Sequence, residues 1–151
     1  MIVCVAGTFN IFHKGHKQLI DTAFQTAGKN GRVFIGITEG ELLREKKFTK
    51  PITERKNAVK EYLSIKGYEN RSVIKTITDK YDITIDGDFD AIIVSPETIE
   101  NAHDINKKRI SLGKKPLRII EIPHVLAEDN KPISSTRIFN KEIDENGKVL
   151  G

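Results

Sequence analysis

Five runs of apolar residues lie along the chain, and amphipathic or polar stretches separate them. The runs cover residues 2–6, 32–38, 72–78, 91–95 and 117–122. Several are nearly continuous Val and Ile rather than alternating apolar and polar residues, which is typical of parallel strands buried on both faces. We therefore predict five parallel β-strands at these positions.

Helical periodicity fills most of the intervals between the strands. The first helix is predicted over residues 16–27, where one stripe consists of Leu19, Ile20, Ala23, Phe24 and Ala27. The second is predicted to begin at Thr53 as its N-cap and to end near Gly67. A third covers residues 97–112, and a short last helix begins in the Ser134 cluster.

This alternation predicts an α/β fold, a doubly wound parallel sheet of about five strands flanked by helices. The chain has 151 residues, the length of one domain (1–151), and residues 142–151 are predicted to be a flexible tail. Ligands of such sheets bind at the carboxyl ends of the strands. We therefore expect the turn after the first strand to meet the Ser134 cluster at that edge.

The turn after the first strand carries the most specific pattern. Residues 6–16 read Ala-Gly-Thr-Phe-Asn-Ile-Phe-His-Lys-Gly-His, so His13 and His16 flank Gly15 at the start of a helix. At Gly7 the backbone can approach a ligand closely. Two imidazoles, neutral or protonated, beside the free N–H groups of a helix N-terminus suit a phosphate whose charge grows during a reaction. The pattern indicates nucleotide chemistry.

A purely structural role and a zinc site are the alternatives for these histidines. A single histidine near a helix start is usually a satisfied polar residue, but two spaced by three after a Gly-Thr turn are less easily explained in this way. His-x-x-His can also chelate zinc, but further ligands would have to come from Cys4, His103 and His124, which form no ligand pair. We therefore predict no metal site built by the protein.

A second cluster reads Ile-Ser-Ser-Thr-Arg-Ile over residues 133–138. One hydroxyl residue is explained as a helix cap, whereas Ser134, Ser135 and Thr136 together exceed what a cap needs. Arg137 in the first turn opposes the helix dipole unless an anion lies there. We predict that the cluster binds terminal phosphates with Arg137 as a charge clamp, and plain capping is the alternative.

Two further candidates are less specific. Residues 44–50 form a basic loop after the second strand, and Lys46 or Lys47 could close over phosphates, although such runs are usually solvated faces. Asn106 and Arg109 share one face of the third helix because they are three residues apart. A surface pair is the simpler interpretation of these two residues.

Composition narrows the class of protein. Hydrophobic residues make up 38% and charged residues 30%, with a net charge of +4, which weakly favours anionic ligands. The chain has no apolar stretch of membrane-spanning length and no export leader, and its single cysteine fits a cytoplasmic protein. Aromatic and basic residues are not interleaved, so we expect no nucleic acid partner. The absence of the Walker and dinucleotide-binding glycine motifs argues against kinases and dehydrogenases that use them.

Gly7-Thr8-Phe9, His13-x-Gly15-His16 and Ile133-Ser-Ser-Thr136 resemble the nucleotidyltransferase superfamily with the His-x-Gly-His signature. Within it, residues 14–17, 51–55, 94–98, 105–109 and 126–129 are similar to phosphopantetheine adenylyltransferases of the archaeal and eukaryotic type. The resemblance implies a Rossmann-like fold and a reaction of coenzyme A biosynthesis. In that reaction ATP and 4′-phosphopantetheine give dephospho-coenzyme A and pyrophosphate, and Mg²⁺ accompanies ATP. We expect a monomer or small homo-oligomer.

The resemblance also implies a role for each motif residue. The catalytic residues would be Thr8, His13, His16 and one of Lys46 and Lys47. ATP would bind Gly7, Thr8, Phe9, His16, Ser134, Ser135, Thr136 and Arg137. The acceptor would bind Thr8, Asn10, Lys46, Lys47, Asn106 and Arg109. Asn10 stands where these relatives usually carry Asp. A phosphate dianion is already a nucleophile at neutral pH, so the reaction depends on positioning and charge stabilisation rather than on a general base.

Two rival functions stay open at this point. A cytidylyltransferase acting on glycerol phosphate or a polar head group, or an adenylyltransferase acting on a flavin nucleotide, would use the same turn and the same terminal motif. A non-catalytic nucleotide-binding module would bind ATP without releasing pyrophosphate. Exchanging the nucleotide and the acceptor in a pyrophosphate assay separates these possibilities.

Overall fold

The computed structural model describes residues 1–44, 48–82 and 87–151. Within them, a parallel sheet has the strand order β3-β2-β1-β4-β5. The strands are β1 (Ile2–Gly7), β2 (Arg32–Thr38), β3 (Ser72–Ile77), β4 (Ala91–Val94) and β5 (Arg118–Glu121). The α/β fold and the five strands are thus confirmed, and each strand end lies within one residue of its predicted position.

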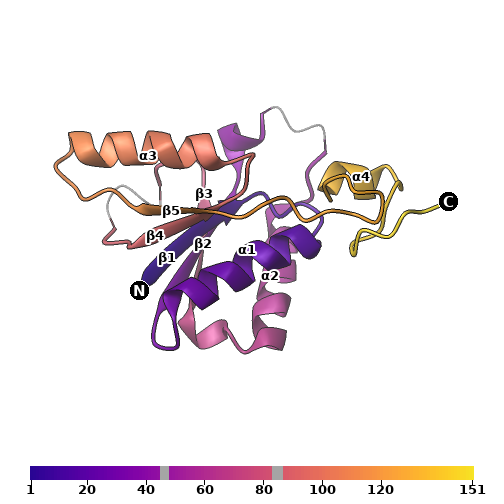
Figure 1. Cartoon of the computed structure of the whole chain (residues 1–151), viewed down its shortest axis with the longest axis horizontal. Helices are drawn as coiled ribbons and strands as arrows, with labels where there is room; N and C mark the ends of the chain where they lie inside the picture. Colours follow the sequence, from indigo (N-terminus) through magenta and orange to yellow (C-terminus); the bar gives the residue numbers. More distant parts are fainter. Residues whose placement is uncertain (45–47, 83–86) are drawn as a thin grey trace.

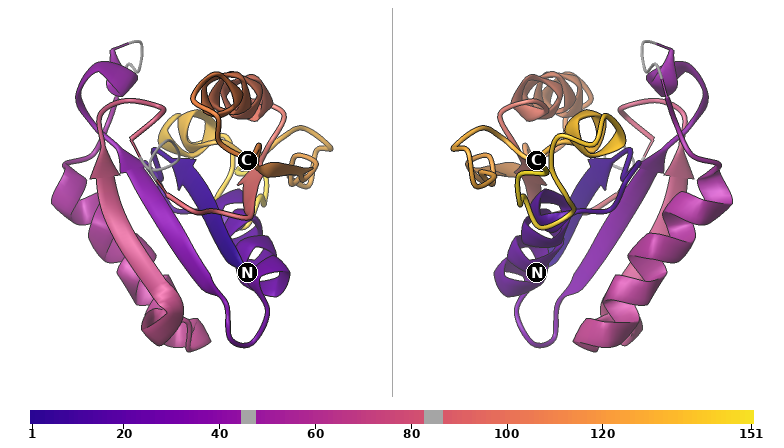
Figure 2. Two further views of the ribbon diagram at one scale, coloured as in Figure 1. Left: turned by 90° about the vertical axis from the view of Figure 1, so that its left-hand side faces the viewer. Right: turned by 90° about the vertical axis from the view of Figure 1, so that its right-hand side faces the viewer.

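Helices cover both faces of the sheet. α1 (Lys14–Ala27) and α2 (Ile52–Lys66) lie on one face and α3 (Ile99–Ser111) lies on the other (Figure 1). The end-on views in Figure 2 show this three-layer arrangement, with the short helix α4 (Ser135–Phe139) beyond the carboxyl ends of the strands. Among the described residues there are also two short 3-10 turns, η1 (Gly40–Leu43) and η2 (Glu69–Arg71). In the described ranges, no helix has the length and apolarity needed to cross a membrane.

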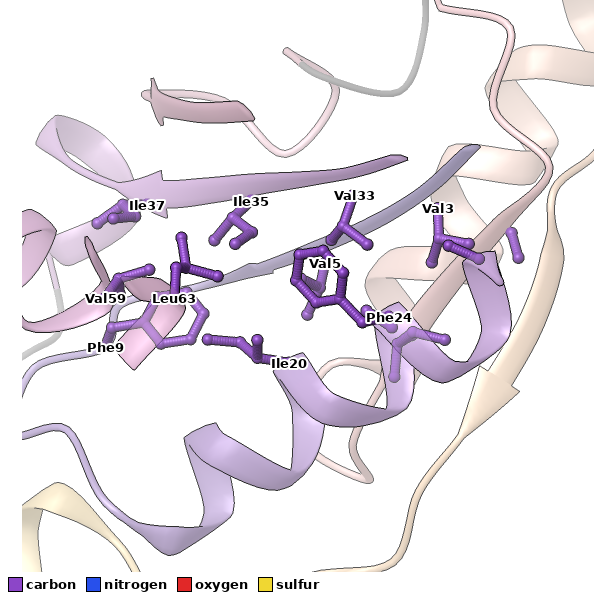
Figure 3. Close-up of a cluster of buried hydrophobic side chains, with 14 of the residues drawn as sticks. Val3, Val5, Phe9, Ile20, Phe24, Val33, Ile35, Ile37, Val59 and Leu63 are labelled. Carbon is purple, nitrogen blue, oxygen red and sulfur yellow. The ribbon is translucent and has the colours of Figure 1, made fainter. Parts of the chain in front are cut away.

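Alternate residues of each strand point to opposite faces and build two cores. Val3, Val5, Val33, Ile35 and Ile37 pack with Ile20, Phe24, Val59 and Leu63 of α1 and α2, as Figure 3 shows. Cys4, Ile92 and Val94 pack with Ala102 and Ile105 of α3. Burial on both faces explains the continuous apolar runs in the sequence.

Helix starts differ from the sequence prediction. α1 begins at Lys14, two residues early, because His13 caps it. α2 begins at Ile52 directly after Pro51, so Thr53 lies inside the first turn and is not the N-cap. Proline fixes its own φ near the helical value, so Pro51 leads directly into the helix without a capping side chain.

Residues 142–151 form a packed turn where the sequence predicts a flexible tail. Ile143 is fully buried and packs with Ala127 and Ile133 in a small cluster of its own. The backbone carbonyl of Glu145 accepts the N–H of Lys14 at 3.1 Å, which attaches this turn to the start of α1. A single buried isoleucine and backbone hydrogen bonds order this segment, and neither produces a periodic sequence signal.

Candidate functional site

The candidate site lies at the carboxyl edge of the sheet, where the strand order reverses between β1 and β4. The turn after β1 and the start of α4 meet there. The N–H of Ile11 donates to Ser135 Oγ at 3.1 Å, and the same hydroxyl donates to the carbonyl of Ile11 at 3.3 Å. The predicted meeting of the two motifs is therefore confirmed.

His13 and His16 close the N-terminus of α1 as a reciprocal capping box. His13 Nδ1 accepts the N–H of Gly15 at 3.0 Å, and His16 Nδ1 accepts the N–H of His13 at 3.2 Å. A neutral imidazole carries its proton on the nitrogen that is not accepting. Both rings therefore carry their proton on Nε2, which leaves two Nε2–H donors for a ligand.

The two rings stack with their centroids 3.8 Å apart and their planes at 20°. Burial lowers the pKa of His13 to about 4. Burial, and then the charge of His13, lower the pKa of His16 well below its ordinary value. Both side chains are therefore neutral near pH 7, which decides between the neutral and protonated forms that the sequence left open.

Gly15 has no Cβ, and the His13 ring occupies the space that a Cβ would need. A Cβ at this position would lie 2.8 Å from His13 Cε1 and 3.0 Å from His13 Nδ1. His16 is fixed from the other side by Phe9 and Phe12, whose ring centroids lie 5.0 and 5.6 Å from its own. The Gly in His-x-Gly-His thus serves the geometry of the histidine before it.

Phe9 supports the turn from inside the protein. It is fully buried in the core and has a φ of 50°, an uncommon left-handed conformation for an aromatic residue. A Cβ on Gly7 would approach the Phe9 ring to 3.3 Å. The prediction that Phe9 contacts ATP is therefore corrected: it packs beneath the turn and presents no surface to a ligand.

Arg55 is a site residue that the sequence reasoning missed. Its fully buried side chain donates through one terminal nitrogen to the carbonyls of Thr8, at 3.1 Å, and Thr38, at 2.6 Å. The same guanidinium bonds the Lys50 carbonyl through Nε at 2.8 Å and pairs with Glu39 at 3.3 Å. It joins the ends of β1 and β2 to the start of α2.

The sequence does contain a signal for Arg55. It stands four residues before Val59 and eight before Leu63, both of them buried, so it occupies an apolar position of α2. A charged residue in such a stripe has to be paired within the protein. Thr8 lies beside it, and its hydroxyl accepts a hydrogen bond from the Thr38 hydroxyl at 2.9 Å.

Asn10 binds the chain that leads into α2. Its Nδ2 donates to the carbonyl of Phe48 at 2.7 Å, and its Oδ1 accepts the N–H of Lys50 at 2.7 Å. Lys46 and Lys47, predicted to be catalytic, lie outside the described residues.

The hydroxyl cluster has different roles at each position. Ser134 Oγ accepts the N–H of Arg137 at 3.2 Å and caps α4, and Thr136 is exposed. The guanidinium of Arg137 pairs with Asp129 and, at 3.4 Å, with Glu142. These carboxylates compensate a cation at a helix start, so the clamp on phosphates stays a prediction.

The prediction that Asn106 and Arg109 bind the acceptor is also corrected. Asn106 bonds both backbone groups of Leu117, donating to its carbonyl at 2.8 Å and accepting its N–H at 2.7 Å. Arg109 is buried and donates to the carbonyls of Lys115 and Gly87 at 2.8 and 3.0 Å. α3 runs from the end of β4 back to the start of β5, so its last turn lies away from the site. Both residues fasten this connection, and they are neither acceptor ligands nor a surface pair.

The donor groups at the site are imidazole, hydroxyl and backbone N–H groups. No group of three or more His, Cys, Asp or Glu side chains is placed to hold a metal ion among the residues that the structure describes. Such a donor set suits the phosphates of a nucleotide, which bring their own cation.

Sequence comparison agrees with this description. A family model described as cytidylyltransferase-like matches residues 4–141. The phosphopantetheine adenylyltransferase of Methanosarcina mazei is 43% identical over 148 residues, which cover 97% of this chain and 96% of the relative. The phosphopantetheine adenylyltransferase of Archaeoglobus fulgidus is 41% identical over 151 residues, which cover 99% of this chain and all of the relative.

Solved structures share the fold. A protein of unknown function from Archaeoglobus fulgidus superposes with a TM-score of 0.70 at 38% identity, over 80% of this chain and 97% of that one. Tyrosyl-tRNA synthetase from the same organism superposes with a TM-score of 0.66 at 13% identity, over 90% of this chain and 59% of that one. The second likeness concerns the fold alone.

Proposed function

Because this chain belongs to the cytidylyltransferase-like family and, within it, to the phosphopantetheine adenylyltransferases, we propose that it transfers the adenylyl group of ATP to 4′-phosphopantetheine. The products are dephospho-coenzyme A and pyrophosphate, in coenzyme A biosynthesis. The observation that carries the proposal is the pair of neutral imidazoles at the edge where the β1 turn meets α4, whose Nε2–H groups have no hydrogen-bond partner among the residues that the structure describes.

The transfer is an in-line displacement at the α-phosphorus of ATP. An oxygen of the acceptor's phosphate forms the new P–O bond, and the bond from the α-phosphorus to the bridging oxygen breaks, so pyrophosphate leaves with that electron pair. The acceptor is a dianion at neutral pH and needs no proton removed. Nε2–H donors of His13 and His16 stabilise the charge that develops on the phosphate oxygens.

Neutral histidines suit this task because their hydrogen bonding does not depend on taking up a proton. The reciprocal capping bonds fix both rings before substrate binds, so no reorganisation is needed during the reaction. Thr8 would orient the attacking oxygen. Ser134, Ser135, Thr136 and Arg137 would hold the β- and γ-phosphates, and Lys46 or Lys47 would approach the α-phosphate.

Mg²⁺ would accompany ATP, and the chemistry it would supply is neutralisation of part of the charge on the departing pyrophosphate. The site's own donors fit this arrangement because they are hydrogen-bond donors to phosphate rather than ligands of a cation. We place the reaction in the cytoplasm, with ATP and 4′-phosphopantetheine as partners of a monomer or small homo-oligomer.

The test is pyrophosphate release from the purified protein with ATP, Mg²⁺ and 4′-phosphopantetheine. Parallel reactions replace ATP by CTP, or the acceptor by glycerol phosphate or a flavin nucleotide. Release with ATP and 4′-phosphopantetheine alone, lost in His16→Asn, is the expected result. Release with another pair would retain the chemistry and reject the substrate. ATP binding without release in any reaction would indicate a binding module and reject the proposal.

A further inference from the structure

Asn10 lies at the junction of three segments that surround the candidate site. It belongs to the turn after β1, and its side chain bonds the backbone of residues 48–50. The next residue, Ile11, is bonded to Ser135 of α4. A third contact joins residues 48–50 to α4: the side-chain rings of Phe48 and Phe139 stack with their centroids 4.3 Å apart and their planes at 19°.

The bonds of Asn10 need a carboxamide. Nδ2 has to donate to the Phe48 carbonyl while Oδ1 accepts from the Lys50 N–H, each at 2.7 Å. An ionised carboxylate has two acceptors and no donor, so it would face the Phe48 carbonyl with like partial charge. Both polar ends of the Asn10 side chain therefore bind backbone groups of the protein itself.

Arg55 holds the same short segment from its other side. Its Nε donates to the Lys50 carbonyl at 2.8 Å, while one terminal nitrogen donates to carbonyls at the ends of β1 and β2. The N–H and the C=O of Lys50 are therefore both fixed by side chains from other parts of the chain. A loop held in this way keeps one position relative to the turn that carries the histidines.

We propose that Asn10 is a positioning residue of the adenylyl transfer: with Arg55 it clamps residues 48–50 to the β1 turn and so sets how the segments around the α-phosphate face one another. The proposal rests on the proposed function for its kinetic consequence but not for the clamp itself. It also replaces the expectation from the sequence that Asn10 binds the acceptor. Loss of the clamp displaces catalytic groups without removing a substrate contact, so kcat falls while KM changes little.

The first experiment follows amide hydrogen exchange at Lys50 by NMR in the ligand-free protein. Asn10→Ala and Asn10→Asp are compared with Asn57→Ala and Asn57→Asp, because Asn57 is exposed on α2 and matches both changes. Exchange of the Lys50 amide is expected to become at least tenfold faster in Asn10→Ala only, because alanine lacks the acceptor of the Lys50 N–H and aspartate keeps it. The N–H of Arg55, which bonds the Pro51 carbonyl, is the internal control within α2. Unchanged exchange at Lys50 would overturn the clamp whether or not the protein is an adenylyltransferase.

The second experiment measures steady-state pyrophosphate release by the same variants. Both Asn10 variants are expected to lose at least tenfold in kcat, with KM for ATP and for the acceptor within about threefold of wild type, and both Asn57 variants should match wild type. A raised KM for the acceptor at unchanged kcat would show that Asn10 binds the acceptor and would reject the proposal. Wild-type kcat in Asn10→Ala would reject it as well. Absence of activity in the unmodified protein would reject the proposed function and leave the exchange result on the clamp standing.

Discussion

His13 and His16 hold each other in place: their rings stack at 3.8 Å, and the N–H of His13 is bonded to Nδ1 of His16. Capping thus uses Nδ1 of each ring, and Nε2 points its proton elsewhere. The capping role and the proposed role in binding phosphate therefore belong to different atoms and can be tested separately. Asparagine can reproduce the Nδ1 acceptor at the helix start, but it cannot place a donor where Nε2–H lies.

Replacing either histidine by asparagine should therefore slow catalysis strongly and preserve the fold. His13→Asn and His16→Asn are each expected to lower kcat by about 100-fold to 1,000-fold, the cost of removing one donor to a developing oxyanion. The measurement is pyrophosphate release, with thermal unfolding as the control for folding. A variant that keeps wild-type kcat would show that its Nε2–H does not contact the reacting phosphate.

The free energy of unfolding should decrease as the pH is lowered below neutrality, and His13 accounts for part of this decrease. The pKa of His13 is about 4 in the folded protein and about 6.5 when unfolded. Between these values the unfolded chain binds the proton first, so the free energy of unfolding decreases as pH falls from 6.5 towards 4. From pH 7 to pH 5 this amounts to about 2 kcal/mol for His13.

Urea unfolding of wild type and His13→Asn at both pH values measures this difference. Carboxylates titrate in both proteins, so their contribution cancels in the comparison. His16 loses the neighbouring charge of His13 in the variant, which eases its own protonation and acts in the same direction as the loss of His13. Wild type is expected to lose about 2 kcal/mol more than His13→Asn between pH 7 and pH 5. Equal losses would mean that His13 accepts a proton as readily in the folded state as in the unfolded chain.

Gly15→Ala should separate stability from activity. Alanine favours a helix over glycine by about 1 kcal/mol, which offsets the capping bond that is lost when the His13 ring moves away from the new Cβ. The melting temperature should stay within a few degrees of wild type, while kcat falls at least tenfold because the ring leaves its position. In the double variant with His13→Asn, the glycine change should cost nothing further. Additive losses would show that Gly15 acts independently of His13.

The sequence predicts most of the fold and the meeting of the β1 turn with the start of α4, for physical reasons. Strands buried on both faces leave continuous apolar runs. The His-x-Gly-His pattern after a strand indicates a phosphate site, because few other roles explain two histidines at this spacing at a helix start. The role of Asn10 was not predictable, because its partners Phe48 and Lys50 are bonded through backbone atoms that any residue supplies. Arg109 was misjudged for a related reason: a buried guanidinium that bonds loop carbonyls looks like an exposed cation in the sequence.

The last ten residues provide the clearest stability test, because the sequence and the structure disagree there. Ile143 has no exposed surface and packs on Ala127 and Ile133, next to α4. Ile143→Ala should therefore lower the free energy of unfolding by about 2–4 kcal/mol, as for other large-to-small changes in a core. KM for ATP should rise, because the cluster supports the helix that begins with Ser135.

Leu150→Ala is the matched control for this change, since Leu150 is 46% exposed and its truncation should alter stability by less than about 0.5 kcal/mol. Urea unfolding and ATP titration of the two variants provide the measurements. If Ile143→Ala is as stable as Leu150→Ala, residues 142–151 behave as the flexible tail that the sequence predicts. A large loss of stability for Ile143→Ala alone would mean that this turn is part of the packed structure that supports α4. Weaker ATP binding by the same variant would mean that truncating Ile143 also weakens the site, at a distance from the histidines.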